Sequence, residues 1–596
     1  MASIEPIAGK LASVRDTAYN QYKLTVVNLT LSVHSINGQE SLSQPWRYKT
    51  HFTCANKEIN ICLIFSQSAS LTFQSLPLAK QLTKICSFEK TTQPRTLYGV
   101  ITEFNLLSVS KDEARYFVVL QPRLYLFANQ RFRVICQNQS VVSVVEVIRM
   151  QHGFTGVDHQ LVPKDNYPAR QFITQWQSDL EFIQRLLIDI GIWFRFESHT
   201  EYHCDVLVLS DYQQGLEHTG TITFKAPSNT VDGLISSVCD LQLQNKMVKH
   251  KIVTQDCNYR TVEANQYSRV NSLPQDNTTI GTNYRYGEHD KTQSDNEQIK
   301  SGLWYAEIRH EHYISAKSIL HGVYNDYHPS SDQCIIIDGS PISGIGEDVI
   351  ILSTLSHGDR RVSYQTHFTA IPYDVLRPYL SKSLAWLQVS GTLLTKVNCP
   401  NNDIYSYIDS QERYQVKFDF NLKTWKHGEE SLWVPLAKPY SGDTYGFHFP
   451  LIDDAGVAIA FIEDNPDQPN IAHALHDSTH PDHVTTAQKH RNVMRTPTNN
   501  KLRMDDKRSQ EHIKLATEYG KTQLNIAHLV NKNKEQRGER TELGTSGNVL
   551  IKSNAMLKMR PANLDSSTNI PREINFKRTM NEQIQNQPAY WLWTNR

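Results

Sequence analysis

A cluster of histidines and aspartates near residue 480 contains the side chains of this chain that are best suited to chemistry. Its members are His473, His476, Asp477, His480, Asp482 and His483. Imidazole nitrogens ligate zinc and a nearby carboxylate can orient the imidazole, so this cluster could serve a metal-dependent hydrolase. However, its spacing matches no established zinc motif, and Pro481 interrupts any helix that would align the imidazoles. Hydrogen bonding is the simpler interpretation, and metal binding stays open as the alternative.

Three further patterns could be written as functional motifs, and each has a simpler explanation. HTEYH at residues 199–203 and RHEHY at residues 309–313 each contain two histidines, but on a strand such histidines normally face solvent or complete a core. GSPISGIG at residues 339–346 lacks the lysine and the strand-to-helix context of a phosphate loop, which favours a turn. The sequence has no G-x-S-x-G motif of a serine hydrolase. We therefore predict that the chain is not an enzyme and has no catalytic, cofactor-binding or metal-ligating residues.

The segment before the histidine cluster, Trp386 to Leu475, has a pattern that is typical of a small β-barrel. Alternating, aromatic-rich runs are separated by Asp, Asn, Gly and Pro at the spacing of short strands. The runs are WLQVSGTLL, RYQVKFDF, SLWVPLA, YGFHFPLI and VAIAFI. In the second run, apolar residues from Tyr414 to Phe420 alternate with Lys417 and Asp419, which predicts one buried and one solvated face. Such a set of runs suits an OB-like barrel.

Aromatic side chains of this barrel could in principle stack nucleic-acid bases, as in some OB folds. The candidates are Tyr407, Tyr414, Trp433 and Phe447. Base stacking requires a basic groove around the rings, whereas this segment is rich in acids. They are Asp409, Asp419, Glu429, Glu430, Asp453 and Asp454. We therefore expect the aromatic residues to pack in the core or between subunits, and we predict no specific nucleic-acid partner.

Beyond His490, the pattern changes to short strands that each have one narrow apolar face. The apolar positions are Leu502, Met504, Ile513, Leu515, Leu524 and Ile526. Asp505-Asp506 and Tyr519-Gly520 separate the strands, and no helix pattern in this segment is long enough to cover the face. Such a ribbon cannot bury its apolar side alone, whereas three copies could close into a prism with an apolar axis. The segment predicts a homotrimer.

Two helices and many short strands are expected between residues 23 and 380. Ser178 and Glu181 form a capping-box signature before an apolar helix face, and Gly191 supplies the stop. That face consists of Leu180, Ile183, Leu186, Leu187 and Ile190. A valine-rich helix is predicted from about Ser140 to Gln151, held by burial because β-branched residues disfavour helix. IWFRFE, CDVLVLS, TGTITF and RVSYQTHFTAIP read as strands, so the fold class is mainly β with a few helices.

Several long segments, in a fixed order, resemble the valine-glycine repeat protein G (VgrG) family, the trimeric spikes of bacterial type VI secretion systems. Those of the barrel and ribbon are GDTYGFHFPLID, HALHDSTHPDHV, RTPTNNKLRMDDKR and EHIKLATEYGKTQLN. Those upstream are RTLYGVITEF, YFVVLQPRLYLF and YPARQFITQWQSDLEFIQRLLIDIGIWFRFE. The resemblance covers most of residues 23–550. Glu412 departs from it, because the family usually has Gly in this turn, and so does the sequence beyond Leu550.

The resemblance implies phage-hub-like barrel domains, an OB-like barrel and then a trimeric β-prism needle. The implied domains are an N-terminal extension (1–22), a hub (23–380), an OB-fold barrel (381–475), a neck and β-prism needle (476–560) and a divergent C-terminal tail (561–596). The histidine cluster His473–His483 is then the linker from barrel to needle, and no cofactor is expected.

As the resemblance implies, the function is that of a spike and baseplate hub. It would cap the Hcp tube, contact baseplate proteins, carry a PAAR-type tip protein or effectors and puncture a target-cell envelope. The alternative from the same architecture is the hub or tail spike of a contractile phage or extracellular injection particle.

The tail from Pro561 to Arg596 has two parts with different composition. Its first half is rich in Asn, Ser, Thr and Pro with little apolar periodicity, so alone it should not fold. Its end carries Tyr590, Trp591, Leu592 and Trp593, which could anchor a docking peptide because a few aromatic residues often dominate an interface. The alternative is an end that folds back on the needle.

Length and composition set limits on the class of protein. A chain of 596 residues predicts about three to five domains. No apolar run approaches the roughly 20 residues needed to span a bilayer, and no signal peptide is visible. We expect a chain that is cytoplasmic before firing and is then exported by the secretion machine. Nine cysteines without a C-x-x-C pair predict buried, reduced thiols.

Charge is unevenly distributed although the formal net charge is zero. From Pro481 onward the chain has about 20 Lys and Arg against about 11 Asp and Glu. Solvated walls of a thin β-prism explain a basic needle and tail. Attraction to nucleic acid or to an anionic envelope surface is the alternative.

Overall fold

A computed structural model of the chain divides it into two compact units, residues 1–475 and residues 476–596. The structure describes residues 21–26, 29–65, 67–74, 94–154, 156–162, 167–212, 215–226, 236–257, 267–286, 302–331, 333–342, 348–360, 364–373, 387–400, 405–420, 425–426, 430–431, 433–552 and 590–593. Strands dominate these residues, as the alternating sequence predicts.

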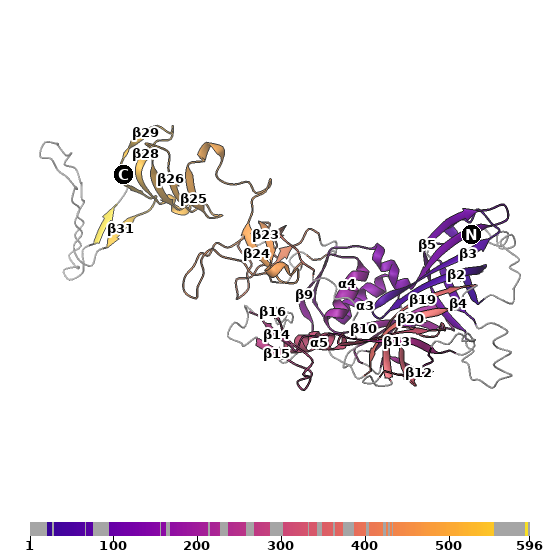
Figure 1. The fold of residues 1–596 in the computed structure, drawn as a ribbon. Coiled ribbons are helices and arrows are strands. Elements are labelled where there is room, and N and C mark those ends of the chain that lie inside the picture. The colour runs from indigo at the N-terminus through magenta and orange to yellow at the C-terminus, as the bar shows by residue number, and fades with distance from the viewer. Residues whose placement is uncertain are drawn as a thin grey trace, which may run out of the picture. The chain divides into compact units, whose positions relative to one another are not determined.

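The first unit is organised around a mostly antiparallel sheet of twelve strands (Figure 1). Its path runs β1-β4-β5-β6-β3-β2-β19-β20-β17-β13, and β18 pairs with β19 and β12. The strands are β1 (Tyr22–Val26), β2 (Leu29–Ser41), β3 (Gln44–Cys54), β4 (Ser68–Phe73), β5 (Arg95–Val109), β6 (Ala114–Gln121), β12 (Glu217–Thr223), β13 (Val238–Asn245), β17 (Ser318–Tyr324), β18 (Gln333–Asp338), β19 (Asp348–Asp359) and β20 (Gln365–Pro372). Alternation explains the pairing, because β3 buries every second side chain from Trp46 to Cys54. Tyr48 and Phe52 join Phe73 and Tyr116 in this core.

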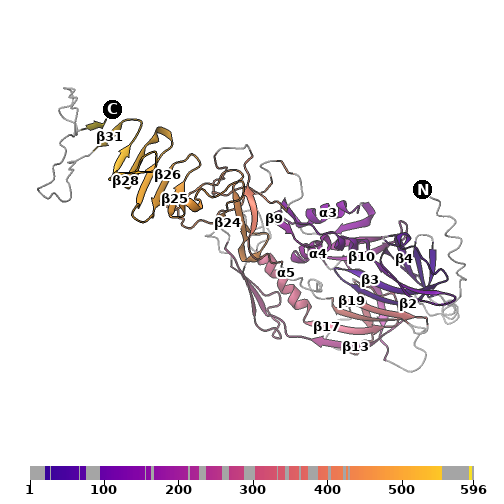
Figure 2. The same cartoon turned by 90° about the horizontal axis from the view of Figure 1, so that it is seen from above.

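Both predicted helices are present and lie next to each other in both views (Figures 1 and 2). Helix α4 (Asp179–Asp189) begins with the complete capping box of Ser178 and Glu181, and Gly191 after its end has a φ of 74°. Helix α3 (Val141–Gln151) is capped by Ser140. Their apolar faces pack together with short strands. Those strands are β7 (Val134–Gln139), β8 (His159–Val162), β9 (Arg170–Gln175), β10 (Trp193–His199) and β11 (Cys204–Ser210).

A third helix, α5 (Gly302–Ser315), was not predicted from the sequence. RHEHY lies inside it, so the interpretation of these histidines as strand residues is wrong. The apolar residues of this helix are only weakly confined to one face. Because the segment also contains Trp, Tyr, His and Ile, which have low helix propensity, its sequence resembles that of a strand. It packs on β14 (Lys251–Gln255) and β15 (Tyr267–Val270), with β16 (Thr282–Tyr286) on the other side of β14. Burial of Ala306, together with Ile252 and Val270, stabilises it.

The barrel region has a four-stranded sheet in the order β22-β21-β23-β24. Its strands are β21 (Leu393–Val397), β22 (Val416–Lys417), β23 (Gly456–Phe461) and β24 (Pro469–Ala474). Tyr414, Val416 and Phe418 are buried while Lys417 and Asp419 are exposed, which confirms the predicted alternation.

Three of the predicted barrel runs do not form the expected strands in their described residues. WLQVSGTLL contributes only the start of β21, SLWVPLA makes only isolated bridges at Val434 and Leu436, and YGFHFPLI forms no strand. The run YGFHFPLI fails because its alternating rings face solvent rather than a second sheet: Phe447 and Phe449 are 50% and 57% exposed. Strand β24 was missed, because Pro and Asn begin it.

The second unit contains an antiparallel meander in the order β25-β26-β27-β28-β29, with β30 on β28. Its strands are β25 (Arg491–Arg495), β26 (Lys501–Asp505), β27 (His512–Ala516), β28 (Gln523–Val530), β29 (Gln536–Glu539) and β30 (Glu542–Gly544). A turn lies at Tyr519-Gly520, as predicted, whereas Asp505 ends β26 and the turn after it lies at Arg508-Ser509, beyond the predicted Asp505-Asp506. Among the described residues of this unit, the helical elements are short 3-10 turns, so none covers the sheet.

The two ends of the chain lie mostly outside the described residues, which leave out residues 1–20 of the predicted extension 1–22 and most of the tail 561–596, while Tyr22 already begins β1. Strand β32 (Tyr590–Trp593) pairs antiparallel with β31 (Val549–Lys552), with Leu592 opposite Leu550. This backbone pairing agrees with the fold-back alternative for the end of the tail.

Eight cysteines lie in the described part of the chain, and all are free thiols. Cys62 and Cys257 are exposed, so the prediction of uniformly buried thiols is wrong for these two. Cys62 lies in a short 3-10 helix and Cys257 follows the end of β14, and both segments are at the surface. No helix of the described residues has the length and hydrophobicity that crossing a bilayer requires.

Candidate functional site

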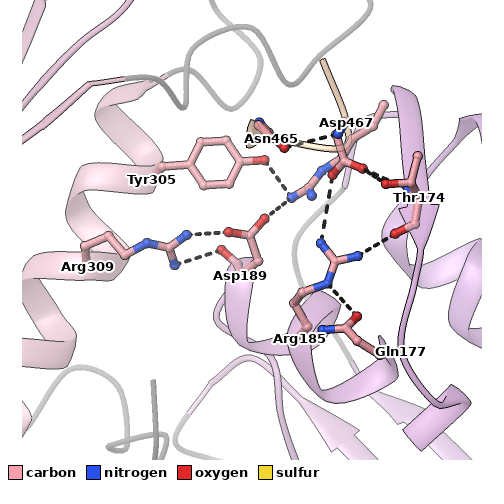
Figure 3. A network of polar contacts seen from close by, with 9 residues as sticks. Thr174, Gln177, Arg185, Asp189, Tyr305, Arg309, Asn465 and Asp467 are labelled. Carbon is pink, nitrogen blue, oxygen red and sulfur yellow. Dashed lines mark hydrogen bonds and ion pairs between the residues drawn. The ribbon is translucent and has the colours of Figure 1, made fainter. Parts of the chain in front are cut away.

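A buried polar network joins the helices of the first unit to its barrel, and Asp189 at the end of α4 is its centre (Figure 3). The Oδ2 atom of Asp189 accepts a hydrogen bond of 2.7 Å from Arg170 on β9. Its Oδ1 atom accepts another from Arg309 on α5, which also donates to the Asp189 carbonyl at 3.1 Å. Arg170 further donates to the Tyr305 hydroxyl at 3.0 Å. One carboxylate therefore ties three elements together.

Arg185 extends the network toward the barrel. Its guanidinium donates to the carbonyl of Thr174 at 2.7 Å and to Gln177 at 3.2 Å, and lies 4.0 Å from Asp467. Asp467 belongs to the loop that joins β23 and β24, and its Oδ1 accepts both the backbone N–H and the hydroxyl of Thr174 at 2.8 Å. The loop is fixed by these bonds to β9 (Figure 3). The barrel and the helices are thus connected through charged groups removed from water.

Burial makes this network sensitive to the loss of one partner. Burial by itself lowers the pKa of the Arg170 guanidinium, but Tyr305 and Asp189 together raise it by more. Arg185 is different: burial lowers its pKa, and Asp467 offsets only part of this effect. Because an unpaired buried charge costs several kcal/mol, the ion pairs hold the elements in one arrangement rather than simply adding stability.

An apolar core reinforces the same junction. Trp176, which follows β9, packs its ring 5.1 Å from Phe420 and 6.4 Å from Phe461 of the barrel. Ile135 and Phe172 share this core with the barrel residues. Gln137 on β7 also donates to the carbonyl of Glu430 at 2.9 Å. Apolar packing and polar bonding together fix the barrel against β7 and β9.

The meander of the second unit presents a different kind of site, an apolar face without a cover. Cross-strand pairing aligns the side chains of this face in two rows. The first row is Met494, Leu502, Leu515, Leu524 and Leu543, and the second is Met504, Ile513 and Ile526. Leu515 is 54% exposed and Leu543 is 52% exposed. This confirms that the described ribbon does not bury its own apolar face, and such a continuous patch marks an interface.

The histidine cluster does not assemble around a common point in the described part of the chain. No group of three or more His, Cys, Asp and Glu side chains there is arranged to hold a metal ion. Asp477 instead organises a turn by accepting hydrogen bonds from Thr479 and from the N–H of His480. The hydrogen bond from the Thr479 hydroxyl has the largest effect, and together these bonds hold the pKa of the Asp477 carboxyl well below its usual range. His483 lies 3.4 Å from Asp482.

The other predicted histidine motifs have structural roles. His310 in α5 is fully buried, with its Nδ1 3.1 Å from the N–H of Ser272 and its Nε2 3.0 Å from the carbonyl of His250. Burial lowers the pKa of His310. His199 and His203 flank an exposed turn after β10. Gly339 follows β18 with a φ of 74°, which agrees with the turn predicted for GSPISGIG in its described half.

The candidate base-stacking residues of the barrel do not share a face. Tyr414 is buried in the core, whereas Tyr407 packs on Trp433 with ring centroids 5.1 Å apart. Phe447 lies in an exposed loop, stacked 6.0 Å from Phe449. The prediction of core packing is therefore confirmed for Tyr414, whereas packing of the exposed Phe447 between subunits stays a prediction.

Glu412 occupies its turn with a φ of 56°, in the left-handed region that glycine prefers. Its carboxylate forms an ion pair with Lys438 and lies 3.0 Å from Nδ1 of His448. The strained backbone at this departure from the family pattern is thus accompanied by two side-chain contacts that glycine could not make.

Three family descriptions match the chain in order. Residues 39–360 match the phage tail baseplate hub, residues 404–476 the type VI secretion system/phage-baseplate injector OB domain, and residues 491–557 the putative type VI secretion system Rhs element Vgr.

Curated relatives include type VI secretion spike proteins and a toxin. The chain is 22% identical over 514 residues to the type VI secretion system spike protein VgrG4b of Pseudomonas aeruginosa, covering 81% of this chain and 60% of the relative. It is 22% identical to the actin cross-linking toxin VgrG1 of Vibrio cholerae, covering 82% of this chain and 44% of the toxin. The chain thus spans less than two thirds of these relatives.

Solved structures share the fold. The E. coli c3393 protein, described as a type VI secretion component similar to the T4 phage tail proteins gp27 and gp5, is 31% identical with a TM-score of 0.56. The match covers 76% of this chain and 99% of that protein. The Francisella PdpA-VgrG complex matches at 11% identity with a TM-score of 0.57, over 87% of this chain and 80% of that one.

Proposed function

This chain belongs to the VgrG family of type VI secretion spike proteins, and on that premise we propose that it forms a homotrimeric spike and baseplate hub. The observation that carries the proposal is the uncovered apolar face of the meander. Three copies that face one another would bury both apolar rows on a common axis. A closed prism of this kind would leave no free lateral sheet edge and would share axial load among the chains.

The proposed mechanism is the transmission of force. The hub would sit on the Hcp tube, in contact with baseplate proteins, and the polar network around Asp189 would keep hub and barrel from shearing. The needle would carry a PAAR-type tip protein or effectors into a target-cell envelope. The solved complex of PdpA with VgrG supports the carriage of a partner protein by a chain of this fold. We expect a chain that is cytoplasmic before firing and is then exported by the secretion machine.

We further propose that the chain acts without catalysis. The relatives named as spike proteins support this, while the portion of the cross-linking toxin that this chain matches is 44% of its length. A hydrolase built on His473–His483 gains no support from any relative. The hub of a contractile phage or extracellular injection particle stays as the alternative of the same fold, because residues 39–360 match the phage hub description.

The proposed domain division is an extension (1–22), a hub (23–380), an OB-fold barrel (381–475), a neck and needle (476–560) and a tail (561–596). The order of the three family matches supports it. For the tail we retain the docking role as a proposal: deletion of residues 561–596 should leave the trimer intact while abolishing co-purification of a tip protein or effector. Retention of partners and of export would show that the tail is no adaptor.

The test of the proposed trimer is a pair of substitutions at the centre of the apolar face. Leu515 and Leu524 lie directly opposite each other on β27 and β28. Leu515→Asp with Leu524→Asp would place charges on the shared axis and should abolish the trimer in light scattering, because buried unpaired charges are costly. Gln523→Asp with Asn525→Asp adds the same charge on the other face of β28 and should leave the trimer intact.

If both double variants remain trimeric, the apolar face is not the trimer interface. If both dissociate, added charge alone explains the effect.

A further inference from the structure

The face of the meander opposite the apolar rows concentrates positive charge. Four of its cations are Arg495 on β25, Lys501 and Arg503 on β26, and Lys514 on β27. Arg495 is the cross-strand partner of Lys501, and Arg503 is the cross-strand partner of Lys514. We call these four residues the basic ladder. Like charges directly opposite each other on a sheet are destabilising, so this arrangement is costly for the isolated face.

In the described part of the chain, none of the four cations of the basic ladder forms an ion pair with a carboxylate, although Asp505 acts on Arg503 and Glu518 on Lys501 from farther away. Arg503 donates to Nε2 of His512 at 2.8 Å, and its buried Nε has no hydrogen-bond partner there. Lys514 donates to the amide oxygen of Gln523. Burial, followed by Arg491, lowers the pKa of Arg503, and burial followed by Arg503 and Lys501 lowers that of Lys514. The cations therefore lie close enough for each to destabilise the charged form of the others.

The same face shows that the meander can neutralise a cation. One row away, Arg491 donates through Nε to Asp505 at 2.7 Å, and Asp505 is only 3% exposed. The charge of Asp505 partly counteracts the lowering of the pKa of Arg503, but its carboxylate accepts its hydrogen bond from Arg491. The basic ladder therefore differs from the Arg491–Asp505 pair in having no carboxylate at ion-pair distance. An anion from another molecule would neutralise its charge instead.

We propose that the basic ladder binds the phosphate groups of an anionic lipid surface. This inference rests on the proposed function, because burial of the apolar face in a trimer leaves the opposite face as the outer wall of the needle. Lys and Arg side chains on such a wall match the charge of lipid phosphates. Single-stranded nucleic acid is disfavoured, because no Phe, Tyr or Trp lies on this face of β25, β26, β27 or β28 to stack bases.

The test uses the full chain and vesicles of phosphatidylcholine, with or without phosphatidylglycerol, in a flotation assay. The wild type should bind only the anionic vesicles and should be released by salt. Since each Lys or Arg near an anionic surface contributes about fivefold to binding, Arg503→Gln with Lys514→Gln should weaken binding at least about tenfold. Lys514→Arg keeps the charge and should bind like the wild type.

The matched control is Lys507→Gln with Arg508→Gln, which removes the same charge from the exposed turn between β26 and β27. It should change vesicle binding less than about twofold. An equal loss of vesicle binding in both double variants would show that net charge alone determines binding. That result would overturn the proposed lipid site at the basic ladder. Tighter binding to duplex or single-stranded DNA than to anionic vesicles at equal salt would also overturn the lipid site.

Light scattering on the same samples separates this inference from the proposed function. A wild type that is trimeric but does not bind anionic vesicles overturns the lipid site alone. A monomeric wild type contradicts the proposed spike, whether or not vesicles are bound. Each variant must keep the wild-type mass, so that weaker binding reports the ladder rather than misfolding.

Discussion

The junction around Asp189 and the meander of β25 to β30 differ in whether their side chains find partners within one chain. At the junction, charged groups from α4, α5, β9 and the barrel loop satisfy one another within a single chain. In the meander, the two apolar rows find no cover among the described residues of the chain. The first region satisfies its polar groups within one copy, whereas the second leaves an apolar face that the proposed trimer would cover. The comparison indicates that folding of one copy and the proposed assembly depend on different parts of this sequence.

The largest expected effect is the loss of Asp189, because it would break the self-sufficient region. Asp189→Ala leaves Arg170 and Arg309 buried without their carboxylate, which should cost about 3–5 kcal/mol of folding stability. Hydrogen exchange should rise in α4, α5 and β9 but not in β25 to β28. Asp419→Ala removes an exposed carboxylate as the control and should change stability by less than about 0.5 kcal/mol. Equal exchange in both variants would mean that Asp189 does not hold the junction.

Acid should weaken the first region through His312 of α5. Burial, followed by Arg309 and Arg285, lowers the pKa of His312 to about 4. The unfolded chain takes up this proton near pH 6.5, whereas the folded chain takes it up only near pH 4, so stability falls as the pH drops through this window. The loss should be about 2–3 kcal/mol. His312→Gln should flatten the dependence of the thermal midpoint on pH between 6.5 and 4, and exposed His476→Gln should not.

A smaller effect is expected at Glu412, where strain and ion pairing oppose each other. Glu412→Gln keeps the left-handed backbone but loses the charge that faces Lys438 and His448, which should cost up to about 1 kcal/mol. Glu412→Gly loses the same charge but relieves a strain of about 1 kcal/mol, so it should be the more stable of the two variants. The thermal midpoints of the two proteins check this order. The reverse order would show that the turn is not strained.

The smallest expected effect is that of chelation at the histidine cluster. If His473 to His483 form only hydrogen bonds, a chelator should leave the melting temperature of the assembled protein unchanged. Purified protein should contain substoichiometric metal by mass spectrometry. One tightly held zinc per chain would establish the metal-site alternative.

Local signals made part of the structure predictable. The capping box at Ser178 and the stop at Gly191 define α4 because both act within one helical turn. The alternation of the meander was equally clear, since a period of two places Leu515 and Leu524 on one face. The sequence did not predict helix α5, because its aromatic and β-branched residues do not repeat with the 3.6-residue period of an amphipathic helix.

The polar junction was beyond prediction from the sequence. Arg309 lies 120 residues from Asp189, and Thr174 lies 293 residues from Asp467. No spacing rule connects residues so far apart, because tertiary packing alone brings them together. The basic ladder lies between these cases: the excess of basic residues was visible, but the pairing of Arg503 with Lys514 needed the strand register.

The most direct test of the account is the mass of the full chain in solution, measured by light scattering at low micromolar concentration. We expect a single species of three times the chain mass of 68.4 kDa, which persists on dilution because the apolar rows would be buried between copies. A stable species of one chain mass would contradict it, since the apolar face would then be exposed to water in the native protein.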